Sequence, residues 1–134
     1  MTQEEQKILL QDLCARLPHD VNVWVKTHHG QIIESDILTL CNGGGYYSTL
    51  TYEGIMNDSV VKPYLRPFSE MTEEEKKEYK DLLYCVKYAD DTVLAVNMLT
   101  DWLNAHHFDY RGLIPMGLAL KAPEGMYNVV NESE

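Results

Sequence analysis

Valine alternates strictly with other residues in the stretch Val21-Asn22-Val23-Trp24-Val25. Successive side chains of a β-strand point to opposite faces, so the pattern puts the three valines on one face and Asn22 with Trp24 on the other. The stretch is therefore predicted to be a half-buried strand. Helical patterns lie on both sides of the strand region, and the predicted fold class is α+β.

Four to five short strands are predicted between residues 21 and 66. Apolar runs at 32–33, 37–40, 46–52 and 60–65 are separated by turn signals, of which Asn42-Gly43-Gly44-Gly45 is the strongest, because Asn-Gly accommodates the positive φ angles of a tight hairpin. Another turn is expected at 27–30. Pro63 lacks an amide donor, so the last strand should lie at a sheet edge or end there. We expect an antiparallel sheet or a curled barrel.

A first helix is predicted over residues 1–17. Thr2 and Glu5 have the spacing of a capping box, and Pro18 stops the helix. The apolar residues recur at helical intervals, which predicts one buried stripe: Ile8, Leu9, Leu13 and Leu17.

Two further helices are predicted within residues 72–105. Thr72 with Glu75 forms a second capping box, Glu73 and Lys77 form an exposed pair, and Asp91 caps the next helix. The first helix is expected to bury Tyr79, Leu82, Leu83 and Val86, and the second Leu94, Ala95, Met98, Leu99, Trp102 and Leu103.

The 134 residues suit a single domain spanning 1–134. Residues 106–127 contain three glycines and two prolines, so this segment is predicted to be mostly irregular, with one helical turn after Asp109. The polar residues 128–134 are expected to fray.

The net charge of the chain limits the classes of partner that it is expected to bind. The 11 Lys and Arg residues are outnumbered by 21 Asp and Glu residues, giving a net charge of -10. Direct nucleic-acid binding and docking on an anionic membrane both need clustered basic residues, so neither is predicted. The sequence has no basic, apolar leader and no apolar run of the roughly 20 residues that cross a bilayer. A cytoplasmic protein is expected.

The three cysteines are far apart and follow no metal-binding or disulfide pattern. Cys14, Cys41 and Cys85 are therefore predicted to be reduced and mostly buried. No cofactor is predicted either, because Gly43-Gly44-Gly45 is not followed by the Lys-Ser/Thr and helix of a phosphate loop.

Histidine pairs at 28–29 and 106–107 raise the possibility of a metal site. Adjacent side chains do not share a direction on a helix or strand, so one pair cannot easily hold one ion. A site would need His107 and Asp109 joined by a ligand such as His28 or Asp36. No recognised ligand spacing supports it, and no metal or catalytic residue is predicted.

The densest group of chemically versatile side chains lies between residues 101 and 114. Trp, Tyr and Arg are the residues that most often anchor protein interfaces. In one interpretation this segment is a protein-binding site; in the other, Trp102 and Phe108 close the core while Asp109 and Arg111 fix the chain that leaves the last helix. The candidate site residues are Trp102, His106, His107, Phe108, Asp109, Tyr110 and Arg111.

Three segments resemble a family of short hypothetical proteins encoded in gut bacterial genomes and in their phages and mobile elements. They are Lys62-Pro63-Tyr64-Leu65-Arg66-Pro67 continuing through 69–79, the segment 101–114, and an opening at 10–18. The resemblance is strongest over 62–127 and weakest across the strands. It implies a phage or mobile-element setting and carries no assigned activity.

The first functional hypothesis is a non-catalytic interaction module that binds a host or phage protein. The second is a small metal-dependent hydrolase or nuclease-like enzyme using His107 and Asp109. The third is an acidic mimic of nucleic acid, with carboxylates spaced like phosphates.

Overall fold

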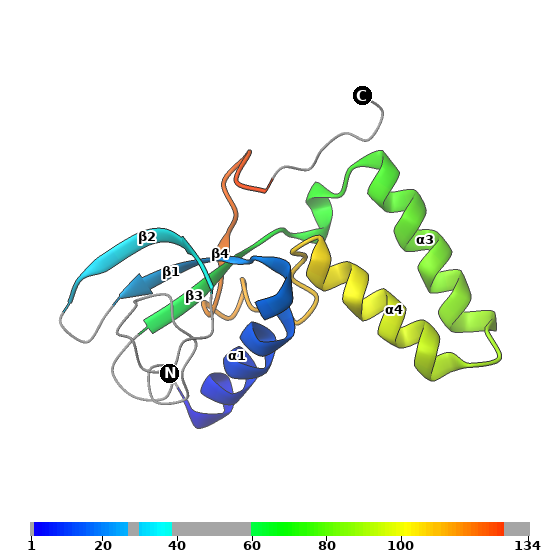
Figure 1. Ribbon diagram of the computed structural model, residues 1–134, viewed down its shortest axis with the longest axis horizontal. Coiled ribbons are helices and arrows are strands. Elements are labelled where there is room, and N and C mark those ends of the chain that lie inside the picture. Colours follow the sequence, from blue (N-terminus) through cyan, green and yellow to red (C-terminus); the bar gives the residue numbers. More distant parts are fainter. Residues whose placement is uncertain (1, 27–29, 39–59, 128–134) are drawn as a thin grey trace.

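The computed structural model describes residues 2–26, 30–38 and 60–127 (Figure 1). The helices are α1 (Gln3–Arg16), α3 (Glu73–Tyr88) and α4 (Thr92–Ala105), with 3-10 turns η1 (Leu17–His19) and η2 (Phe68–Glu70). The strands are β1 (Asn22–Lys26), β2 (Ile32–Ile37), β3 (Val60–Leu65) and β4 (Leu120–Lys121). The predicted α+β class, with an N-terminal helix, a sheet and then two helices, is confirmed.

Helix α1 begins where its capping box predicts. The Glu5 amide donates to the Thr2 hydroxyl and the Thr2 amide donates to the Glu5 carboxylate, at 3.1 and 2.9 Å. Leu9 and Leu13 are buried as expected, whereas Ile8 and Leu17 are only partly buried. The helix therefore packs on the sheet through the stripe that the sequence predicts.

The sheet has the order β2-β1-β3-β4. Strands β2 and β3 both run antiparallel to β1, and Val21, Val23 and Val25 are completely buried beneath α1 with Leu65. The predicted valine face is confirmed. Within the described residues the sheet is open, so the curled-barrel alternative is not the one adopted.

The strands described between residues 21 and 66 pair antiparallel, as predicted. Strand β4 lies in the segment predicted to be irregular, and it runs parallel to β3. After α4 the chain returns along the end of β3, where unpaired backbone groups need partners. The Arg66 amide donates to the His107 carbonyl at 2.7 Å, and the Ala122 amide donates to the Leu65 carbonyl at 2.8 Å. The segment 106–127 is otherwise irregular, as predicted, although turns replace the helical turn expected after Asp109.

Pro63 does not place β3 at an edge of the sheet, because β3 lies between β1 and β4. The pairing with β4 starts only at Tyr64. Among the described strands, Pro63 pairs only with β1. Its lack of an amide donor is therefore tolerated, because the hydrogen-bonded pairing of β3 with β4 does not include Pro63.

The α3–α4 hairpin, residues 73–105, extends away from the sheet (Figure 1). Both predicted N-caps are confirmed: Thr72 and Glu75 form a capping box, and the Asp91 carboxylate accepts the Leu94 amide at 3.0 Å. Glu73 pairs with Lys76 at 3.2 Å rather than with the predicted Lys77. Within the described residues, no helix has both the length and the apolar character to cross a membrane.

The buried stripes predicted for this hairpin are only partly correct. Ala95 and Leu103 are buried, but Leu83, Leu94 and Met98 are exposed. The main core joins α1, the sheet and residues 113–119, and none of its members comes from α3 or α4. The two helices contact mainly each other, with a smaller contact between α4 and α1, and these contacts do not cover every apolar position.

The cysteine prediction is also wrong for two residues: Cys14 and Cys85 are exposed. Cys14 lies on the outer side of α1, because the buried side is occupied by Leu9, Asp12, Leu13 and Arg16. Cys41, the turns at 27–29 and 42–45, the strand predicted at 46–52 and the tail 128–134 lie outside the described residues.

Candidate functional site

An aromatic cluster joins the base of the α3–α4 hairpin to the rest of the molecule. Its members are Phe68, Tyr79, Trp102, His106 and Phe108, with neighbouring ring centroids between 4.3 and 6.4 Å apart. Phe108 is completely buried, and the half-buried Trp102 donates from Nε1 to the Glu78 carboxylate at 2.7 Å. These rings close the interior, in agreement with the second interpretation of the segment.

The two adjacent histidines have different surroundings. His106 Nδ1 lies 2.9 Å from the Trp102 carbonyl, so this nitrogen carries the hydrogen and donates it. His107 adopts a left-handed backbone with φ of 62°, and its ring stacks on Tyr127. Burial, with a smaller contribution from the Arg16 charge, lowers the pKa of His107 to about 4. His107 is therefore neutral at pH 7.

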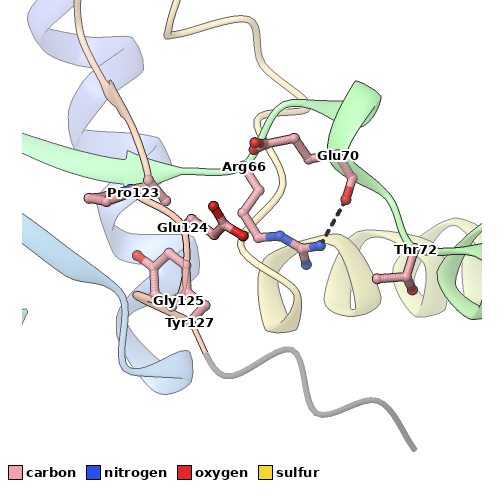
Figure 2. A pocket seen from close by; sticks show the side chains of 8 residues that line it. Arg66, Glu70, Thr72, Pro123, Glu124, Gly125 and Tyr127 are labelled. Carbon is pink, nitrogen blue, oxygen red and sulfur yellow. Dashed lines mark hydrogen bonds between the residues drawn. The ribbon is translucent and has the colours of Figure 1, made fainter. Parts of the chain in front are cut away.

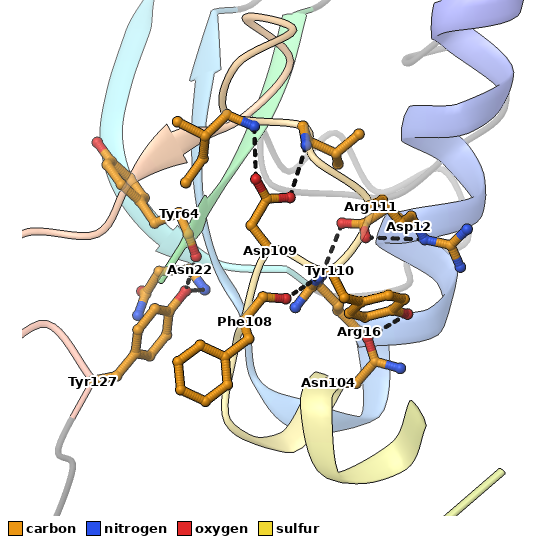
Figure 3. Close-up of polar contacts among 12 residues, drawn as sticks. Asp12, Arg16, Asn22, Tyr64, Asn104, Phe108, Asp109, Tyr110, Arg111 and Tyr127 are labelled. Atoms are coloured by element: carbon orange, nitrogen blue, oxygen red, sulfur yellow. Dashed lines mark hydrogen bonds and ion pairs between the residues drawn. The ribbon is translucent and has the colours of Figure 1, made fainter. Parts of the chain in front are cut away.

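The other three candidate residues hold the loop after α4 (Figure 3). The Asp109 carboxylate accepts the amides of Leu113 and Ile114 at 2.7 and 2.9 Å. The Tyr110 hydroxyl donates to the Asn104 side chain at 2.9 Å. Arg111 pairs with the buried Asp12 at 3.2 Å. All seven candidate residues thus make contacts within the chain, and their part in binding a partner stays a prediction.

A buried ion cluster that the sequence analysis missed anchors this loop to α1. Asp12 and Arg16 are both completely buried and pair at 2.8 Å. Arg16 also donates to the Phe108 carbonyl at 2.6 Å and lies 5.1 Å from the Tyr110 ring centre (Figure 3). The signal was present in the sequence, because positions 12 and 16 fall on the same helical stripe as Leu9 and Leu13.

A second buried ion pair, between Arg66 and Glu75, attaches α3 to the end of β3. Two hydrogen bonds of 2.7 and 2.8 Å join their side chains, and Arg66 also donates to the carbonyls of His106 and Glu70. The Arg66 guanidinium lies 4.3 Å from the Phe108 ring centre. Burial alone would raise the pKa of Glu75, but the hydrogen bonds from Arg66 and Thr72 outweigh it and lower that pKa.

A cavity of about 420 Å³ lies beside Arg66 (Figure 2). Its walls come from the segment between β3 and α3, including Glu70 and Thr72, and from residues 122–125 and Tyr127. The Arg66 guanidinium is already committed to Glu75, and Glu70 lies 3.6 Å from Lys121. The lining residues include no histidine, cysteine or serine. Its polar side chains are those of Arg66, Glu70, Thr72, Glu124 and Tyr127, and the Thr72 hydroxyl already accepts the Glu75 amide at 3.1 Å.

The described residues also lack a cluster of three His, Cys, Asp or Glu side chains that could hold a metal ion. The Asp109 carboxylate is occupied by two amides, and Asp36 accepts the Ile37 amide at 2.8 Å. His28 lies outside the described residues. The metal-site hypothesis therefore gains no geometric support.

Large apolar side chains are exposed mainly on the α3–α4 hairpin. Among the described residues, four such exposed side chains lie elsewhere in the chain, whereas seven lie on the hairpin. We call these seven the hairpin surface: Leu83, Tyr84, Tyr88, Val93, Leu94, Val96 and Met98. Val93 reaches an exposed fraction of 71%, and the Tyr84 and Tyr88 rings contact each other, tilted by 43° with centroids 4.6 Å apart.

The charge distribution sets α4 apart from α3. The 16 residues of α3 include nine charged ones, whereas the 14 residues of α4 include only Asp101. A helix that is apolar on all sides is normally covered on all sides. Nothing among residues 2–26, 30–38 and 60–127 covers the outward side of α4, which makes the hairpin surface the candidate site. In comparisons with known proteins, no family model, curated protein or solved structure matches the chain.

Proposed function

We propose that the protein is a non-catalytic interaction module that binds another protein through the hairpin surface. The observation that carries the proposal is the concentration of exposed apolar side chains on a helix that has one charged residue. Contiguous apolar surface of this kind is a feature of protein interaction sites. The resemblance to proteins of phages and mobile elements makes a host or phage protein in the cytoplasm the expected partner.

The composition of the surface favours a protein over other partners. The centre of a protein interface is depleted of charged residues and enriched in aromatic residues and methionine, and the hairpin surface contains Tyr84, Tyr88 and Met98. A nucleic-acid mimic would instead present carboxylates there, and an enzyme would present groups that can react. Neither alternative is supported by the side chains on this surface.

The structure also explains how such a surface can be displayed. The aromatic cluster and the Arg66–Glu75 pair hold the base of the hairpin, while the main core between α1 and the sheet has no member from α3 or α4. The hairpin can therefore expose apolar side chains without the fold depending on their burial.

The proposal is tested by affinity capture from cells of the expected host type, with quantitative mass spectrometry of the bound proteins. The test variant is Val93→Glu with Met98→Glu. The control is Ile32→Glu, which adds one such charge to an exposed apolar residue of β2. Far-ultraviolet circular dichroism verifies that all variants keep the wild-type helix content.

We expect specific proteins captured by the wild type to be retained by the Ile32→Glu control and lost at least tenfold with the hairpin variant. Equal capture by the wild type and the hairpin variant contradicts the proposal. Equal loss with both variants also contradicts it, because the binding would then not depend on the hairpin.

A further inference from the structure

The cavity beside Arg66 is built by two segments that lie far apart in the sequence. One is the connection between β3 and α3, with Glu70 and Thr72, and the other is the chain after β4, with Glu124 and Tyr127 (Figure 2). Its volume of about 420 Å³ falls within the range of about 300–1,000 Å³ that small-molecule sites have. The cavity is therefore large enough to hold a ligand, and its lining restricts the chemistry of that ligand.

Arg66 does not make the cavity an anion site. Each of its two terminal nitrogens already donates two hydrogen bonds: Nη1 donates to Glu75 and to the His106 carbonyl, and Nη2 donates to Glu75 and to the Glu70 carbonyl. The Glu75 carboxylate, at 2.7 Å, also neutralises its charge. A phosphate or carboxylate ligand would have to displace Glu75 from a buried ion pair, and leaving a buried charge unpaired is costly.

The carboxylates of Glu70 and Glu124 give the cavity a negative charge. Among the described residues, none forms a hydrogen bond or an ion pair with the Glu124 carboxylate. Glu70 meets Lys121 in an exposed pair at 3.6 Å, and such pairs contribute little stability. In a chain of net charge -10, these two groups favour a cationic ligand.

The remaining walls favour a planar cation. Ala122, Pro123 and the ring of Tyr127 are apolar, and the Tyr127 hydroxyl is already bonded to the Tyr64 carbonyl and the Asn22 amide. An ammonium group is compact and strongly hydrated. A guanidinium is weakly hydrated, packs on aromatic rings and donates two parallel hydrogen bonds to a carboxylate. An aromatic wall beside an unpaired carboxylate therefore suits a guanidinium better.

We infer that this cavity binds a guanidinium group, with the Glu124 carboxylate as its acceptor, Glu70 adding negative charge and Tyr127 forming a flat wall. The site is separate from the hairpin surface and does not depend on the proposed function. The guanidinium can belong to a free small molecule or to an arginine side chain in a segment of another protein. Both sources share the same chemistry, and the experiment distinguishes them.

The test titrates the ¹⁵N-labelled chain of 134 residues with two probes and follows the amide resonances. The probes are free arginine and a capped glycine-arginine-glycine peptide, each added up to about 20 mM because contacts of a single group are weak. Low ionic strength limits the screening of charge. Citrulline, free or in the same peptide, is the control, since it replaces the guanidinium by an uncharged urea of similar shape. We expect saturable shifts at Thr72 and residues 122–127 with arginine but not with citrulline.

Three substitutions test whether the cavity carboxylates hold the probe. Glu124→Gln and Glu70→Gln each remove one cavity carboxylate, and Glu74→Gln removes the same charge from an exposed position on α3. We expect Glu124→Gln to weaken binding about tenfold or more, because it removes the charged acceptor, and Glu70→Gln to weaken it less. Glu74→Gln should leave the Kd unchanged. All three side chains are exposed, so the variants should keep the wild-type fold.

The absence of saturable binding by both arginine probes overturns the inference. Equal binding of arginine and citrulline also overturns it, as does binding that Glu124→Gln leaves unchanged. If free arginine binds at least as tightly as the peptide, the ligand is a free small molecule. Tighter binding of the peptide identifies a basic segment of another protein as the source.

Discussion

The imidazole of His107 lies flat against the phenol ring of Tyr127, with ring centroids 3.8 Å apart and planes 13° apart. This contact joins the turn after α4 to the last described part of the chain. Tyr127 is fixed in turn by two hydrogen bonds: its hydroxyl donates to the Tyr64 carbonyl at 2.6 Å and accepts the Asn22 amide at 3.0 Å. The stacked pair therefore links α4, β3 and β1, and both rings are titratable groups that are largely buried.

Acid should destabilise the fold through His107. Its pKa is 6.5 in the unfolded chain and about 4 in the folded one, so between these values only the unfolded chain binds the proton. Stability is fully present above pH 6.5 and is lost as the pH falls toward 4. Partial exposure reduces the full effect to about 2 kcal/mol. Urea unfolding at pH 7 and pH 4.5 measures the loss.

The control for that experiment is His107→Asn, because asparagine tolerates the left-handed backbone and does not titrate. The variant should show a smaller loss between the two pH values than the wild type. An identical pH dependence in both proteins would mean that His107 does not carry the effect.

Removing the Tyr127 hydroxyl should destabilise the protein at neutral pH. Tyr127→Phe keeps the ring that stacks on His107 but leaves the Tyr64 carbonyl and the Asn22 amide without this partner, which costs about 1–3 kcal/mol. Chemical unfolding gives the value. The exposed Tyr84→Phe should change the free energy of unfolding by less than about 0.5 kcal/mol, and a loss as large as that of Tyr127→Phe would contradict the assignment.

Tyr127 should also make the protein sensitive to alkali. Burial raises the pKa of Tyr127 from 10.0 to about 12, so above pH 10 the unfolded chain loses this proton first. The stabilisation is present below pH 10 and disappears as the pH rises toward 12. Melting temperatures at pH 9 and pH 11 should fall less for Tyr127→Phe than for the wild type, and equal falls would refute the prediction.

Breaking the Arg66–Glu75 pair should be among the most damaging single changes. Glu75→Ala leaves the buried Arg66 charge without its counter-ion, and removing one member of a buried pair costs about 3–5 kcal/mol. Glu75→Gln should cost less, because its amide oxygen can still accept hydrogen bonds from Arg66 and Thr72. Equilibrium unfolding ranks the variants, with the exposed Glu74→Gln as control; equal stability of Glu75→Ala and that control would contradict the role assigned to the pair.

Replacing the buried Asp12 should also lower the free energy of unfolding, because Asp12 joins α1 to the loop after α4. It neutralises Arg16 and contacts Arg111, so Asp12→Asn leaves two guanidinium groups without a carboxylate. We expect a loss of about 3 kcal/mol by thermal or urea unfolding. The exposed Glu4→Gln on the same helix serves as the matched change. A difference below about 0.5 kcal/mol between the two variants would fall within ordinary surface effects and reject the prediction.

Residues 102–111 show which properties of a site the sequence can predict and which it cannot. The aromatic and ionic side chains at 102–111 combine large area with polar ends, a composition that fits both a protein-binding site and the closing of the interior. Whether they faced a partner or the interior depended on what packed against them. Arg16 from α1 and Arg66, the residue after β3, determine that, and both lie far away in the sequence.

For the hairpin surface, the sequence pattern predicted burial and the structure shows exposure. Apolar periodicity in α3 and α4 predicted buried stripes, and it could not indicate that the hairpin extends from the fold with little to cover it. Leu94 and Met98 have the spacing of core residues and are nevertheless exposed. The same pattern fits burial in the chain's own core and burial against a partner.

Local rules alone determined the helix starts, the valine face of β1 and the α+β class, because caps and periodicities depend on residues within a few positions of each other. Tertiary structure alone decided that β4 pairs in parallel with β3, that Arg16 meets the Phe108 carbonyl, and that no described segment covers the apolar side of α4. These features depend on which distant segments meet, and the free energy of such contacts has no signature in any short stretch of sequence.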